Sequence, residues 1–150
     1  PFEWFLVPPS DRRDPTRVRS AMLTLDEFVR RFPDSPYVED GIAILERMAR
    51  TVISFEMEVA HFYMTRNKPA GAVGRLQRLL AEVPRAGGFE DARFAYVEAL
   101  AANGDKEVLG RECESFRQRF PSGRHRDRVE SLCRAATASA GNESAEVRKL

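Results

Sequence analysis

One helix-ending pattern occurs three times in this 150-residue chain. In each copy, apolar residues three or four positions apart lead into a proline, at Phe28–Pro33, Leu80–Pro84 and Phe116–Pro121. A proline cannot continue a helix, because it lacks the backbone N–H and its ring clashes with the preceding turn. Each copy therefore marks the end of a helix. Repetition of one helical unit is typical of a solenoid, in which helical hairpins stack on one another.

Between these breakers, apolar residues recur with a spacing near 3.6, and no segment alternates with a period of two, so we predict an all-α chain. We expect helices over residues 16–32, 37–66, 70–83, 89–103, 106–120 and 125–138. The second helix is predicted to be unusually long and packed on two sides, because neither Gly nor Pro occurs from Ile42 to Arg66 and apolar residues occupy more than one face. We expect one helical domain over 1–138 and a flexible tail over the polar segment 139–150.

The middle copy of the repeat fits the 34-residue tetratricopeptide pattern. Counting back from Pro84 places the small and large positions of its two helices on Val59, Ala60, Tyr63, Ala72, Leu76 and Leu79. Ala60 and Ala72 are small enough to let two helices cross closely, with Tyr63 beside them. The chain is predicted to be a tetratricopeptide-like α-solenoid of antiparallel helical hairpins with one long central helix.

The first copy lacks room for its first helix, because Pro8-Pro9 and the polar run 11–14 occupy those positions. An uncovered solenoid end exposes apolar side chains, and residues 1–7 (PFEWFLV) form an apolar stub. We therefore expect the chain to be the C-terminal part of a longer protein.

Composition restricts the partners and the chemistry. The net charge of +1 gives no reason to expect nucleic acid, and no run of 18 apolar residues is present. The cysteines, Cys113 and Cys133, lack the spacing of a metal site; they could form one disulfide in an oxidising compartment or remain two small buried hydrophobes.

The sequence shows no pattern of an enzyme. His61 and His125 are the only histidines, and each is predicted on a different helix without a Ser or Cys nucleophile at plausible spacing. Gly71-Ala-Val-Gly74 lacks the Lys-Ser/Thr of a phosphate-binding loop. We expect no catalytic residues, no bound metal and no cofactor.

Two groups of residues are candidates for binding a partner. Arg66, Arg75 and Arg78 are predicted around one hairpin, and they either form a solvated basic ridge, with Glu82 pairing to Arg78, or bind partner carboxylates. Met57, His61 and Met64 recur one turn apart, and they either pack into the core or line a soft groove for a peptide. The basic stretch 117–128 could face anionic lipid, but interspersed acidic residues dilute it.

Four segments together carry a more specific resemblance. They are Ser10–Pro15 (SDRRDP), Phe28–Tyr37 (FVRRFPDSPY), Glu56–Arg66 (EMEVAHFYMTR) and Ala72–Arg75 (AVGR). Their order and spacing resemble the BamD (YfiO-type) family of outer-membrane assembly lipoproteins over Ser10–Pro84, about half of the chain. Beyond Pro84 the similarity is that of a helical hairpin alone. The chain departs from the family in lacking its lipidated cysteine and in having Lys68–Gly71 at the turn where the family has an aromatic residue.

The resemblance implies a docking subunit of the β-barrel assembly machinery at the periplasmic face of the outer membrane. It implies that the C-terminal repeats bind the POTRA region of the barrel subunit, BamA, with Arg75 at the position the family uses toward that partner, and it leaves room for other assembly lipoproteins as partners. Unfolded outer-membrane proteins would bind the missing N-terminal half, and the membrane would be reached through an N-terminal lipid. The alternatives are another periplasmic adaptor, such as one that coordinates cell-wall synthesis, or a generic protein-binding module.

Overall fold

The computed structural model describes residues 16–83 and 89–147, which form six α-helices and no strand. The helices are α1 (Thr16–Arg31), α2 (Val38–Thr65), α3 (Pro69–Glu82), α4 (Glu90–Asn103), α5 (Lys106–Arg119) and α6 (Arg126–Val147). The predicted bounds of the first five helices are confirmed to within one residue at each end. The sixth prediction is wrong at its C-terminal end, because α6 continues to Val147 instead of stopping at residue 138.

Two predictions concern the ends of the chain. The polar segment 139–150 was expected to be a flexible tail, but residues 139–147 belong to α6. Its mobility stays a prediction. The apolar stub 1–7, the polar run 11–14 and Pro84 lie outside the described residues.

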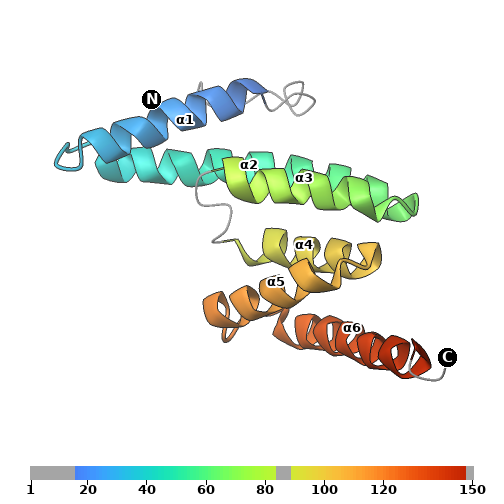
Figure 1. Cartoon of the computed structure of the whole chain (residues 1–150). Helices are drawn as coiled ribbons and strands as arrows, with labels where there is room; N and C mark the ends of the chain where they lie inside the picture. Colours follow the sequence, from blue (N-terminus) through green and yellow to red (C-terminus); the bar gives the residue numbers. More distant parts are fainter. Residues whose placement is uncertain (1–15, 84–88, 148–150) are drawn as a thin grey trace.

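The helices stack in chain order, and α1 and α6 lie at opposite ends of the stack (Figure 1). Each helix packs against the next along the chain, and α4 also contacts both α2 and α6. This arrangement, with contacts between neighbouring helices and between alternate ones, is that of a helical-repeat solenoid. The prediction of a tetratricopeptide-like all-α fold is confirmed.

Local chemistry explains where the helices of the stack begin and end. Asn67 adopts a left-handed backbone, with φ of 56°, in the turn before α3, which starts at Pro69. Gly104 closes α4 with φ of 78°, a conformation that glycine adopts without strain. Asp105 then caps α5, because its carboxylate accepts a hydrogen bond from the Val108 N–H at 3.2 Å.

The close crossing predicted between α2 and α3 is present. Ala60 on α2 and Ala72 on α3 are buried in the core, as is Leu76. Tyr63 is half-buried and packs against this core. The small alanines allow the two helices to approach closely, so that α3 covers one side of α2 while α1 covers another.

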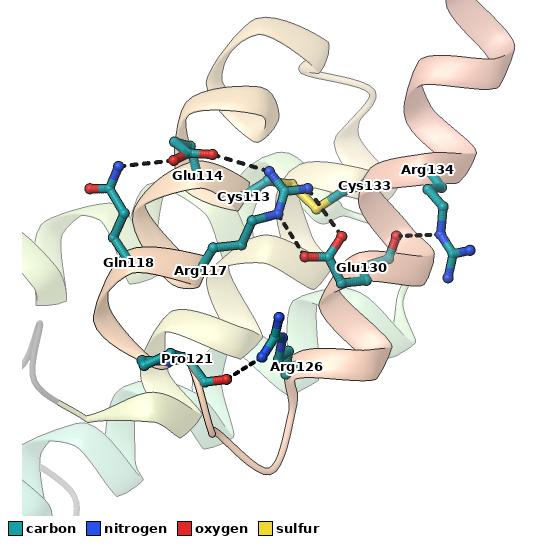
Figure 2. A network of polar contacts seen from close by, with 9 residues as sticks. All are labelled: Cys113, Glu114, Arg117, Gln118, Pro121, Arg126, Glu130, Cys133 and Arg134. Carbon is teal, nitrogen blue, oxygen red and sulfur yellow. Dashed lines mark hydrogen bonds and ion pairs between the residues drawn. A yellow bond between two sulfur atoms is a disulfide. The ribbon is translucent and has the colours of Figure 1, made fainter.

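The C-terminal helices carry a covalent link. Cys113 on α5 and Cys133 on α6 form a disulfide, with their Cα atoms 6.3 Å apart. The sequence left this pairing open, and the structure decides it. Beside the disulfide, Arg117 of α5 forms a double hydrogen bond with Glu130 of α6, at 2.6 and 3.1 Å (Figure 2). The last helix is therefore attached to its neighbour by both a covalent bond and a bidentate ion pair.

None of the helices in the described ranges is long and apolar enough to cross a membrane.

Candidate partner-docking surfaces

A charged cluster joins the first three helices, and we call it the arginine cluster. Its members are Arg19 of α1, Glu56 of α2, and Arg75, Arg78 and Glu82 of α3. Arg19 donates to Glu56 Oε1 at 2.6 Å and to Glu82 Oε2 at 3.3 Å. The Nη1 atom of Arg75 lies 3.5 Å from Glu56 Oε2, and Nε of Arg78 lies 3.8 Å from Glu82 Oε1.

Side-chain exposure increases across the cluster, from the buried Glu56 carboxylate to the exposed guanidinium groups. The side chain of Glu56 is 3% exposed and that of Arg19 is 24% exposed, whereas Arg75 is 41% exposed. Three guanidinium groups face two carboxylates, so one positive charge within the cluster is left uncompensated. The buried Glu56 carboxylate holds Arg19 by a direct hydrogen bond, and the more exposed Arg75 and Arg78 can pair with an external anion.

The structure brings together three of the four residues predicted at this hairpin. Arg75, Arg78 and Glu82 share the cluster, and the expected pairing of Arg78 with Glu82 is present. Arg66 is not joined to it by any contact among the described residues. Its guanidinium instead lies 4.5 Å from the centroid of the Phe62 ring, which is itself 51% exposed. Arg66 thus makes a cation–π contact with an exposed ring instead of joining the ion pairs of the cluster.

Arg19 and Glu56 were missed as members of the cluster. A signal for Glu56 was available, because it lies three residues after Ile53 and four before Ala60, on the apolar face of α2. A carboxylate on such a face must find a charged partner. No comparable signal exists for Arg19, because its partners are 37 and 63 residues away along the chain.

A second surface is a groove of about 810 Å³ between α2, α4 and α6. Met57, His61 and Met64 line it from α2, as the hypothesis of a soft groove requires, and the two methionines also pack against the core. Leu76 of α3 completes this side. The opposite sides are contributed by Phe94, Ala95, Glu98, Ala101 and Ala102 of α4 and by Arg128, Leu132, Ala135 and Ala136 of α6. The alanines keep the groove open between the bulkier side chains.

A group of mostly polar residues, which we call the clasp, lies where α4 and α6 begin and contributes Asp91, Phe94 and His125 to the groove lining. The His125 ring stacks on Phe94 with centroids 4.1 Å apart, and its Nε2 lies 2.7 Å from Asp91 Oδ1. Arg124 also hydrogen-bonds Asp91, and the His125 backbone N–H donates to Glu90 Oε1 at 2.7 Å. The Arg124 hydrogen bond is the main cause that lowers the pKa of Asp91 below its ordinary value, against a smaller opposing effect of burial. The clasp fixes the start of α6 against the first turn of α4.

The groups on these two surfaces are suited to binding another protein. His125, one of the two histidines, is engaged by Asp91 and Phe94, while His61 is exposed on the groove wall. In the described part of the chain, no three His, Cys, Asp or Glu side chains come together in a way that could hold a metal ion. Exposed guanidinium groups and an apolar groove are features typical of protein recognition.

Comparison with known proteins gives the family. The model of the YfiO family, described as an outer membrane lipoprotein, matches residues 4–116. The chain is 33% identical over 89 residues to the outer membrane protein assembly factor BamD of Neisseria meningitidis serogroup A. These 89 residues are 59% of this chain and 31% of the relative. It is 28% identical over 92 residues to BamD of Haemophilus influenzae. That match covers 61% of this chain and 35% of the relative.

A more distant relative extends the match. BamD of Caulobacter vibrioides is 23% identical over 112 residues, which cover 75% of this chain and 37% of the relative. The chain therefore spans about a third of the length of these curated relatives. Since the family model covers well over half of the chain, and the helical-repeat fold agrees with the resemblance, the chain belongs to the YfiO family of outer membrane lipoproteins.

Proposed function

We propose that this chain is a non-enzymatic docking unit in outer-membrane protein assembly, at the periplasmic face of the outer membrane. Family membership and three relatives named as assembly factors support this role. A stack of helical hairpins presents extended side-chain surfaces, and both surfaces described above suit the binding of other proteins.

The arginine cluster is the proposed docking site for the POTRA region of BamA. The observation that carries this proposal is the uncompensated positive charge, displayed on an Arg75 side chain that is 41% exposed. The Arg75 guanidinium lies 3.5 Å from the buried Glu56 Oε2 without a hydrogen bond to it, so it can form a bidentate pair with a carboxylate of the partner. Phe62 and Arg66, at the turn of the same hairpin, belong to residue types that are enriched at protein interfaces.

Replacing Arg75 tests this proposal. We expect Arg75→Glu to weaken binding to detergent-solubilised BamA of the same organism, mainly through faster dissociation and by about 2 kcal/mol or more if the pair is buried in the complex. The matched control is Arg111→Glu on α5, an equally drastic charge reversal at an exposed ion pair with Glu107. Equal affinity of the Arg75 variant and the unmodified chain would remove this residue from the site. Failure of the unmodified chain to bind BamA would favour another periplasmic adaptor role.

The groove is proposed as a second surface, for an apolar peptide segment of another assembly lipoprotein. Its methionines and alanines suit an apolar segment, because methionine adapts its shape to irregular partners. A photo-reactive residue at Met64 should crosslink to such a subunit in outer membranes. The same residue at Leu23, an exposed apolar position on α1, should not. Crosslinks from both positions alike, or from neither, would contradict this role for the groove.

A further inference from the structure

We infer that Arg19 is a positioning residue for docking: it neutralises the buried carboxylate of Glu56 and thereby leaves Arg75 available to a carboxylate of the partner. This inference rests on the proposed function, because it concerns how Arg75 reaches that partner. It assigns a role in docking to α1, which packs against α2, whereas Arg75 is carried by α3 on another side of α2.

The two arginines hold Glu56 unequally. Arg19 forms a hydrogen bond to Oε1 at 2.6 Å, the length of a strong charge-assisted bond. Arg75 lies 3.5 Å from Oε2, and that buried oxygen accepts no hydrogen bond in the described structure. Arg75 is therefore attracted to Glu56 without being bonded to it, while Arg19 supplies the direct contact.

The burial of Glu56 is the reason that Arg19 has to stay paired with it while Arg75 binds the partner. A carboxylate that is 3% exposed must keep a close cation, because an uncompensated buried charge is strongly unfavourable. Arg19 is suited to remain, since it is less exposed than Arg75 and is also held by Glu82 of α3 at 3.3 Å. When a partner's carboxylate draws Arg75 outward, Arg19 continues to neutralise Glu56.

Loss of Arg19 would change the role of Arg75. Arg75 would become the one remaining cation of the cluster next to Glu56, and Glu56 would draw it inward into a direct hydrogen bond. An arginine bonded in this way has to leave a buried carboxylate unpaired before it can bind elsewhere, so the affinity for the partner falls. If Glu56 is removed as well, nothing draws Arg75 inward, and the need for Arg19 disappears.

The test is a double-mutant cycle in the full chain, with binding to detergent-solubilised BamA as the readout. We expect Arg19→Gln to weaken binding about tenfold, and Arg19→Gln combined with Glu56→Gln to return within about threefold of the unmodified affinity. Arg19→Lys, which keeps the charge, should stay close to the unmodified chain. Arg17→Gln removes the same charge from an exposed position on α1 and serves as the control for long-range charge effects.

A second readout needs no partner and keeps the inference separate from the proposed function. In the isolated chain, the Arg75 Nε–Hε resonance should shift and exchange more slowly with water in Arg19→Gln, and both changes should reverse in the double variant. If Arg75→Glu leaves BamA binding intact, the proposed function fails, and this resonance still tests the contact. The inference is overturned if the double variant binds as weakly as Arg19→Gln, which would mean that Arg19 contacts the partner directly, or if the Arg75 resonance does not respond.

Should Arg19→Gln fail to fold, that failure itself shows that the buried charge of Glu56 needs Arg19, and the double variant is then compared with Glu56→Gln alone. The double variant contains neither Arg19 nor the buried charge of Glu56, so its folding does not depend on their pairing. Binding of the double variant within about threefold of Glu56→Gln supports the inference, because Arg19 then acts only through Glu56, and a further loss of about tenfold overturns it.

Discussion

The ring of Tyr63 on α2 occupies the space in which Gly71 of α3 would carry a side chain: a Cβ atom built on Gly71 would lie 2.6 Å from the Tyr63 Cδ1 atom. The absence of a side chain at residue 71 therefore allows the tyrosine to close the hairpin between α2 and α3. That hairpin carries Arg66, Arg75 and Arg78. The packing of the Tyr63 ring against Gly71 therefore positions the backbone of the proposed docking site.

Gly71→Ala should destabilise the chain. Because the ring, and not the far end of a flexible side chain, blocks the new methyl group, we expect a loss of roughly 1–3 kcal/mol in the free energy of unfolding. Gly74→Ala is the matched control three residues further along α3, where nothing lies within 4 Å of an added Cβ. There the change should stabilise the helix by roughly 0.5–1 kcal/mol. Urea denaturation of both variants measures the contrast, and a stabilised Gly71→Ala would contradict the packing described.

Opening the disulfide between Cys113 and Cys133 should lower stability by about 3 kcal/mol, as expected for a closed loop of this size. The two cysteines are 20 residues apart in sequence, and the bond joins α5 to α6, the helix that forms one wall of the groove. Thermal denaturation with and without a reducing agent measures the effect. The variant with serine at both positions should already have the lower stability and should not respond to the reductant.

Stability should depend on the ionisation of Asp91 in acid. The pKa of this carboxyl is lowered in the folded chain, chiefly by its hydrogen bond with Arg124. A lowered pKa means that the folded state favours the ionised form, so the contribution is present above the unfolded-state pKa of Asp91 and is lost as the pH falls through the folded-state value. The side chain is 42% exposed, so the effect is small.

Comparing chemical denaturation of the unmodified chain and Asp91→Asn between pH 7 and pH 2 tests this dependence. The stability difference should shrink toward low pH, and Arg124→Gln should reduce it at neutral pH. A difference that stays constant over the whole range would mean that Asp91 contributes through packing alone.

Asp105→Ala should cost about 1 kcal/mol of stability, because it removes the side-chain acceptor that caps the first turn of α5. Asp105→Asn keeps an acceptor oxygen at the same position and should restore most of that loss. Both values are measurable by urea denaturation. Equal losses in the two variants would show that the charge, and not the capping hydrogen bond, matters at this position.

Local sequence patterns were sufficient to predict most helices, because their limits depend on residues within one turn. Pro69, Gly104 and Asp105 act on their own backbone neighbours, so the predicted bounds of α3, α4 and α5 agree with the structure to within one residue. The end of α6 was missed because its last third is polar and includes Gly141 and Asn142, residues common at helix ends, yet the helix continues through them to Val147.

The candidate sites were predictable only in part. Met57, His61 and Met64 share one face of one helix, so a period of 3.6 residues was enough to place them on one wall. The far walls belong to α4 and α6, and the position of those walls depends on how successive hairpins pack. Arg66 was placed with Arg75 because both flank the same turn, but the nearby exposed ring of Phe62 holds its guanidinium elsewhere.

The amino-acid sequence by itself determined the helical composition of this protein, the repeat, the small residues at the crossing of α2 and α3, and membership of an outer membrane lipoprotein family, since each of these can be read from residue types and their order and spacing along the chain. Only the tertiary structure decided that Arg19 would neutralise Glu56 from 37 positions away and that Cys113 would bond to Cys133. Burial forces a carboxylate to find a cation, but which cation it finds depends on the packing of separate helices, and no local pattern encodes that choice.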